Sequence, residues 1–202
     1  DRRMKRRGLL ILSVLALLLV VLGGTCVSTY NGLVTLDQAV EGQWAQVENA
    51  YQRRADLVPN LVQTVKGAAA HERETLEAIT EARAQVGSLN LGDVTRDAES
   101  LQRFQAAQDQ LSSALSRLLV VSEAYPQLRA NENFLALQSQ LEGTENRISV
   151  ERQRFNEAAR AFNTRRGTFP TVVFAGLFGD RFATKSFFTA SAGTAQAPKV
   201  EF

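Results

Sequence analysis

The chain has 202 residues and a formal net charge of +2, with 23 basic and 21 acidic side chains, one His and one Cys. One Cys excludes an intramolecular disulfide, and a single His with a single Cys cannot form a zinc cluster within one chain. Five basic residues and one acidic residue lie within residues 1–7, so the rest of the chain has a net charge of −2. This distribution excludes the basic surface of a nucleic-acid-binding domain.

A run of apolar residues follows this basic flank. The letters LLILSVLALLLVVL cover residues 9–22, and no charged residue occurs between Gly8 and Leu36. A helix over residues 8–30 would be about 35 Å long, enough for a hydrocarbon core of about 30 Å. We therefore predict a transmembrane helix over residues 8–30. A cleaved signal peptide is the alternative, because a basic flank before a short apolar core is its mark as well.

The charges on either side of the span predict its orientation. The first charged residues after the span are the acidic Asp37 and Glu41, whereas the residues before it are basic. Because positive charge stays on the cytoplasmic side, we expect a cytoplasmic N-terminus and an extracytoplasmic remainder in a bacterial cell membrane. The alternative is that these basic residues only bind anionic headgroups. The orienting residues are Arg2, Arg3, Lys5, Arg6 and Arg7.

Apolar residues then recur at spacings of three and four, the pattern of amphipathic helices. The first helix is predicted to continue from the membrane and to end at Arg54. We expect Asp56 to cap a second helix, with Pro59 in its first turn, where the missing N–H has no intrahelical partner. This second helix is predicted to run to Val86, followed by a loop over residues 87–93.

A third helix is predicted over residues 94–124, ending before Tyr125-Pro126. A fourth begins near Asn131, and its inward positions alternate by three and four from Phe134 to Phe162. No strand-like alternation occurs before residue 166, and short connections favour antiparallel neighbours. We therefore predict an all-α fold, in which the transmembrane helix continues into an elongated antiparallel four-helix bundle over residues 31–166.

Phenylalanine is concentrated after the bundle. Seven of the eleven Phe residues lie within residues 167–202. We predict an irregular Phe-rich strap over residues 167–188 and a flexible tail over residues 189–202, because glycines at 176 and 179 disfavour a stable helix. The strap is expected either to pack back on its own bundle or to dock on a neighbouring subunit or the membrane surface. In the second case the candidate oligomer contacts are Phe174, Phe178 and Phe182.

Four sequence blocks together resemble the LemA family over residues 30–180. They are YNGLVTLDQAV at 30–40, YQRRADLVPNLVQTVKG at 51–67, VVSEAYPQLRANENFLALQSQLEGTENRI at 120–148, and FP followed by FAGLFG within 169–179. The resemblance implies an N-terminal membrane helix followed by an elongated bundle, and it supplies no enzymatic activity. The motif positions that it marks are Asn31, Asp56, Leu57, Pro59, Asn60, Tyr125, Pro126, Asn131, Glu132, Asn133, Phe134, Thr144, Glu145, Asn146, Arg147, Phe169 and Pro170.

Asparagines are prominent among these positions, and two roles are open for them. Their amides can cap helix ends and bind loop backbones, or they can recognise a partner. One departure from the family pattern lies after Gly67, where many members have an aromatic residue and this chain has three alanines and His71.

The sequence predicts no catalytic residue, cofactor or metal ligand. His71-Glu72 is followed by Thr75 at the position where a zinc protease needs its second His, and no Glu-x-x-His pair is available for a di-metal site. We therefore expect a noncatalytic, membrane-anchored structural protein that contacts membrane lipid and self-associates into a homo-oligomeric assembly that organises the membrane. The alternative is an adaptor or accessory subunit of another membrane protein, such as a protease or signalling protein. No small-molecule substrate is identified.

Overall fold

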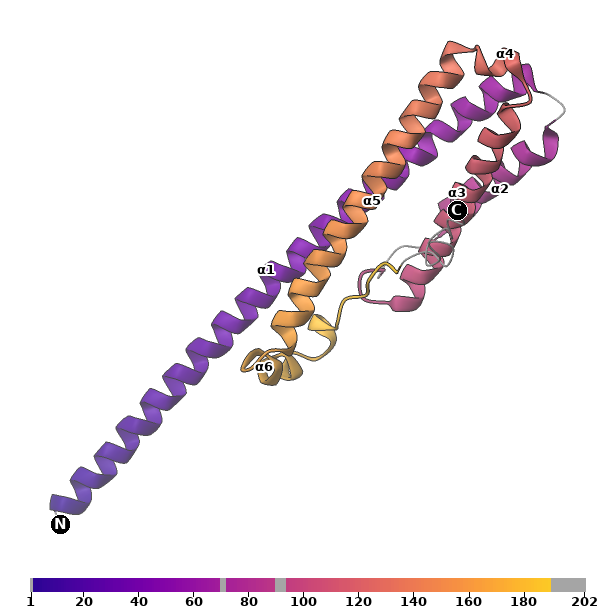
Figure 1. The fold of residues 1–202 in the computed structure, drawn as a ribbon. Coiled ribbons are helices and arrows are strands. Elements are labelled where there is room, and N and C mark those ends of the chain that lie inside the picture. The colour runs from indigo at the N-terminus through magenta and orange to yellow at the C-terminus, as the bar shows by residue number, and fades with distance from the viewer. Residues whose placement is uncertain (1, 70–71, 90–93, 190–202) are drawn as a thin grey trace, which may run out of the picture.

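The computed structural model describes residues 2–69, 72–89 and 94–189, and the side chains of residues 2–5 and 68 lie outside the description, as does the predicted tail from residue 190. Its described residues are helical or irregular and contain no strand, which confirms the predicted all-α class (Figure 1). The elements are α1 (Arg2–Ala68), α2 (Arg73–Ser88), α3 (Ala98–Ser122), α4 (Pro126–Arg129), α5 (Glu132–Gly167), α6 (Thr171–Leu177) and a 3₁₀ turn (Gly179–Phe182).

Helix α1 runs without a break for 67 residues, about 100 Å, from the apolar N-terminal segment to the far end of the bundle (Figure 1). The predicted helix end at Arg54 and the new helix capped by Asp56 are therefore wrong. Pro59 lies inside α1, and its missing N–H would otherwise bond the carbonyl of Ala55. Arg83 Nε from α2 donates to that carbonyl oxygen at 3.2 Å. A side chain from another helix thus supplies the bond that Pro59 removes.

The chain turns after Ala68 instead, so the predicted second helix is divided between the end of α1 and α2. In Figure 1, α1 and α5 run side by side, α2 and α3 form a hairpin, and α4 crosses the end of the bundle remote from the N-terminus. Successive long helices are antiparallel, as predicted for a four-helix bundle with short connections. The predicted third and fourth helices correspond to α3 and α5.

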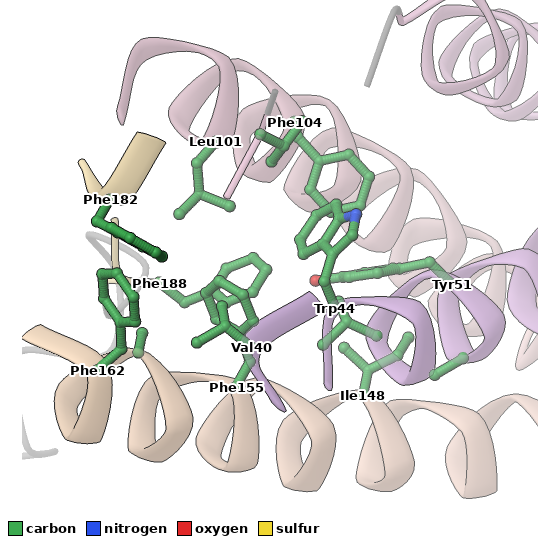
Figure 2. Packing of buried hydrophobic residues seen from close by; sticks show 14 of the residues in the cluster. Val40, Trp44, Tyr51, Leu101, Phe104, Ile148, Phe155, Phe162, Phe182 and Phe188 are labelled. Carbon is green, nitrogen blue, oxygen red and sulfur yellow. The ribbon is translucent and has the colours of Figure 1, made fainter. Parts of the chain in front are cut away.

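The core consists of two apolar clusters along the bundle. The one nearer the N-terminal span contains an aromatic group in which the rings of Phe104 and Phe155 lie edge-on to Trp44, with centroid distances of 5.3 and 5.7 Å (Figure 2). The cluster at the far end is mainly aliphatic, built around Leu61, Ile79 and Leu111, with Phe134 as its one buried aromatic residue among those that the structure describes. The inward positions predicted on the fourth helix are buried at Phe134, Leu141, Ile148, Glu151, Phe155 and Phe162.

Asp97 caps the start of α3. Its carboxylate accepts hydrogen bonds from the Ser100 hydroxyl and from the backbone N–H groups of Glu99 and Ser100, the last two at 3.1 and 3.2 Å. These bonds, that of the hydroxyl first, hold the pKa of Asp97 below its ordinary value of 3.8. Because the folded pKa is lower than the unfolded one, the stabilisation is complete above the unfolded pKa and is lost as the pH falls through the folded pKa.

We expect Asp97→Asn to flatten the acid-induced fall in melting temperature, because the Asn amide caps a helix but does not titrate. The difference between variant and wild type should appear between about pH 5 and pH 2. Circular dichroism melts of the full chain in detergent across this range would measure it. Parallel pH profiles for the two proteins would contradict the role of the Asp97 carboxylate.

Candidate functional site at the membrane-proximal end of the bundle

The N-terminal part of α1 projects from the bundle. The described residues from Arg6 to Gly24 are exposed on every side, and α1 is the one helix in the described part of the chain that is long and apolar enough to cross a membrane. Arg6 and Arg7 are exposed at its start, whereas the side chains of Arg2, Arg3 and Lys5 lie outside the description. The predicted orientation of the span stays a prediction.

The rest of the chain meets α1 immediately after its apolar segment. Thr25 and Cys26 are half-buried, and Thr29 is buried. The ring of Tyr30 lies edge-on to the rings of Phe178 and Phe182, with centroids 5.2 and 5.5 Å away. The strap therefore covers α1 at the junction between the apolar segment and the bundle.

The strap is more regular than predicted, since residues 171–177 form α6 and residues 179–182 form a 3₁₀ turn. Gly179, at φ 62°, lies in the left-handed region two residues after the end of α6 and directly after its cap residue Phe178, where glycine ends helices without strain. Phe182 is buried within its own chain, and Phe174 and Phe178 are half-buried. These three residues therefore offer little free surface to a neighbouring subunit, because the strap packs back on its own bundle.

Beyond residue 182 the strap continues without helix, and two asparagines of α5 hold its backbone. The Asn163 amide donates to the carbonyl of Lys185 at 2.9 Å and accepts from its N–H at 2.8 Å. Asn156 makes the same pair of bonds with Phe188, at 3.0 and 2.9 Å. Neither asparagine is among the positions predicted from the sequence, although their spacing of one heptad on α5 was a usable signal.

Lys185 anchors the same part of the strap to α1. Its side chain is completely buried, and its ammonium group lies 2.6 Å from Asp37 Oδ1 and 3.2 Å from Glu41 Oε1. The Thr95 hydroxyl also donates to Glu41 Oε1, at 2.9 Å. The strap, α1 and the segment before α3 are thus joined through two carboxylates, a contact that no local pattern in the sequence predicts.

An apolar surface remains exposed where the strap begins. We call it the membrane-proximal patch and define it as Phe169, Val172, Val173 and Leu177. Their exposed fractions are 82, 45, 56 and 76%. The opposite side of α6 is buried through Thr171 and Ala175. The patch includes the first residue of the Phe169-Pro170 motif, whose peptide bond is cis.

A buried polar cluster joins two other sequence blocks halfway along the bundle. Arg54, only 1% exposed, donates to Glu145, to the Ser112 hydroxyl and to the side-chain and backbone oxygens of Gln108, the last at 3.2 Å. Glu145 belongs to the TENRI letters and Arg54 to the RRADLV letters. The resemblance marked Glu145, but the burial of Arg54 was missed, because a charged residue at a predicted helix end is usually exposed.

The remaining motif positions lie mostly at the far end of the bundle. The Tyr125 hydroxyl donates to Glu72 Oε1 at 2.7 Å, and this bond to the carboxylate raises the pKa of Tyr125. Pro126 is the first residue of α4, and Asn131 caps α5 by accepting from the N–H groups of Asn133 and Phe134 at 3.0 and 3.2 Å. The side chains of Asn31, Asp56, Asn60, Asn133 and Asn146 are exposed on their helices.

Asn131→Ala should lower the free energy of unfolding by about 1 kcal/mol, because it removes the side-chain oxygen that caps α5. The corresponding fall in melting temperature is about 3 °C for a chain of this size. Asn133→Ala is the matched control, since its side chain is exposed two residues later, in the first turn of α5, and makes no cap. Thermal melts of both variants give the comparison, and equal losses would mean that the cap is not the source of the effect.

Within the described residues, no three His, Cys, Asp or Glu side chains come together as a metal site requires. His71 lies outside the described residues. The buried charges of the described part instead join one segment to another, as at Arg54 and Lys185, or pair along one helix, as Glu151 does with Arg147 and Arg154. Their arrangement serves helix packing.

Comparison with known proteins identifies relatives along most of the chain. The chain is 26% identical over 196 residues to magnetosome protein MamQ of Magnetospirillum gryphiswaldense, covering 88% of this chain and 72% of the relative. It is 25% identical over 189 residues to magnetosome proteins MamQ 1 and MamQ 2 of Paramagnetospirillum magneticum, covering 85% of this chain and 69% of each relative. The sequence model of the LemA family matches residues 43–202, which begin in the bundle part of α1 and extend past the strap. The chain therefore belongs to the LemA family.

Proposed function

We propose that the protein is a noncatalytic structural protein of the membrane, whose copies associate into a homo-oligomeric assembly that organises the bilayer. Family membership and the apolar start of α1 support membrane association. The observation that carries the finer proposal is the continuity of α1, which passes from the apolar segment into the bundle without a hinge.

A continuous helix favours association because it couples the orientation of the bundle to that of the span. Copies held in one membrane with one orientation lose less rotational and translational freedom when they meet than free molecules do. The packing of α1 supports this coupling, since Leu33, Val40 and Val47 are fully buried in the bundle that follows the exposed segment. Side-by-side contact between such bundles would produce a closed or extended array on the membrane.

The mass of the full chain extracted in mild detergent tests this proposal. We expect a discrete particle whose mass is a multiple of 22.2 kDa. Crosslinking before extraction, followed by mass spectrometry, should recover mainly links between copies of the chain. A monomer, or a crosslinked second protein in comparable amount, would contradict self-association and favour the adaptor function instead.

A variant in which the exposed residues 9–24 are replaced by the same number of leucines tests the contribution of the span separately from that of the bundle. It keeps a membrane anchor of the same length but removes the individual side chains of the natural segment. Because the proposal places the contacts between bundles, we expect the particle mass to persist. Dissociation of this variant would show that contacts within the membrane hold the assembly.

A further inference from the structure

We propose that the membrane-proximal patch inserts into the interfacial layer of the same bilayer that α1 crosses, as a second membrane contact of the chain. The patch is apolar, exposed and attached to α1 next to its apolar segment. This inference rests on the membrane insertion of α1 in the proposed function and does not depend on self-association.

The length of α1 places the patch at the level of the membrane surface. A helix from Gly8 to Val27 is about 30 Å long and matches the hydrocarbon core. Tyr30 lies three residues further, about 5 Å, and so within the headgroup layer. Because Phe178 and Phe182 contact the ring of Tyr30, α6 is held at this level. Figure 1 shows α6 beyond the end of α5 and beside α1, on the side of the bundle toward the N-terminus.

Helix α6 has one face buried against the bundle and one apolar face exposed to solvent. Thr171 and Ala175 face the bundle and are buried, whereas Val172, Val173 and Leu177 are exposed. An isolated exposed apolar residue is ordinary, but four within nine residues, at the level of a membrane surface, form a patch typical of interfacial binding. Phe169 adds an aromatic ring, a side chain that favours the membrane interface.

The sequence around the patch has a net positive charge. From Arg160 to Arg181 the chain has four arginines and one acidic residue, Asp180. Arg165 and Arg181 are exposed, and the guanidinium of Arg181 lies 5.4 Å from the centre of the Tyr30 ring. Positive charge beside an apolar face is typical of interfacial segments that bind anionic lipid headgroups. The partner is therefore the lipid surface and not a second copy of the chain.

Fluorescent probes on the full chain in vesicles test this contact. Cys26→Ser removes the one natural cysteine, and Leu177→Cys then accepts an environment-sensitive dye. The vesicles contain phosphatidylcholine and phosphatidylglycerol, with or without phosphatidylcholine that carries a spin label on its acyl chain. We expect the spin label to lower the emission at residue 177 at least about twofold and aqueous iodide to have little effect.

Phe187→Cys is the matched control on the same strap. It is an exposed aromatic position, but the neighbouring Phe188 stacks on Trp44, fourteen residues after Tyr30 and about 21 Å further along α1. Its dye should respond to iodide and not to the spin label. Leu15→Cys, on the exposed apolar part of α1, is the positive control for insertion of the span.

The outcomes separate this inference from the proposed function. Quenching by lipid at residues 15 and 177 but not at 187 supports the inference, whatever the particle mass. Quenching at 15 alone overturns it, and protection of residue 177 from iodide without lipid quenching assigns the patch to a second copy. Lipid quenching at 187 as well would mean that the whole bundle lies on the membrane, which also overturns the inference. Absence of quenching at 15 would remove the membrane insertion on which both proposals depend.

Discussion

Arg54→Met should lower the free energy of unfolding by about 3 kcal/mol, because the buried oxygens of Gln108 lose their donor and Glu145 loses its ion-pair partner. Methionine has a similar length, so the loss comes from the polar cluster more than from a cavity. For a chain of this size the melting temperature should fall by about 10 °C. Denaturant unfolding of the full chain in mild detergent, followed by circular dichroism, would measure the change.

Two further variants identify the cause of this effect. Arg53→Met changes the neighbouring exposed arginine and should alter the free energy of unfolding by less than about 0.5 kcal/mol. Arg54→Lys keeps the charge but loses the planar group that bonds several oxygens at once, so it should fall between Arg54→Met and wild type. If Arg54→Met unfolds like wild type, the cluster does not stabilise the bundle.

Phe155→Ala should destabilise the bundle by about 4 kcal/mol, because it empties a fully buried site against the edges of the Trp44 and Phe188 rings. Figure 2 shows Phe155 of α5 near Trp44 and Phe188. Trp44 is the one tryptophan of the chain, so its fluorescence reports on this site directly. We expect a lower unfolding midpoint and a red-shifted emission in the folded variant, as water enters the cavity.

Phe187→Ala provides the control for this substitution. The same atoms are removed, here from the strap and not from α5, but Phe187 is exposed and its ring is absent from the aromatic contacts of Trp44. Its effect should be below about 1 kcal/mol, with unchanged Trp44 emission. Equal losses for the two variants would show that burial of Phe155 is not what stabilises this region.

The elements with strong helical periodicity were predictable from the sequence. The fourth helix, its start at Asn131 and its inward stripe all depend on spacing and capping within one segment, and the structure confirms them. The continuity of α1 through Asp56 and Pro59 was not predictable in this way. Pro59 disfavours a helix interior locally, but Arg83, 24 residues later, bonds the carbonyl that Pro59 leaves free. A distant side chain thus overrides a local preference.

The polar contacts of the candidate site join residues that are even farther apart in the sequence. Lys185 and Glu41 are 144 positions apart in the sequence, and only the folded bundle brings Lys185 Nζ within 3.2 Å of Glu41 Oε1. Composition predicted an apolar segment after Gly167 but did not predict which of its side chains are buried. Phe182 and Phe188 are buried, whereas Phe169 is exposed. The backbone bonds to Asn163 and Asn156 fix the path of the strap at Lys185 and Phe188.

The two amide pairs between α5 and the strap also constrain how this region can change in length. Asn156 and Asn163 are one heptad apart, about 10.5 Å along a helix, while Lys185 and Phe188 are three residues apart, about 10 Å along an extended chain. Seven residues of α5 and three residues of the strap therefore span nearly the same length, which allows both asparagines to bond the strap backbone. A single inserted residue between 185 and 188 would break this match in length, whereas three inserted residues in the strap with seven in α5 would restore it. Length variation between the two segments is thus expected in matched steps.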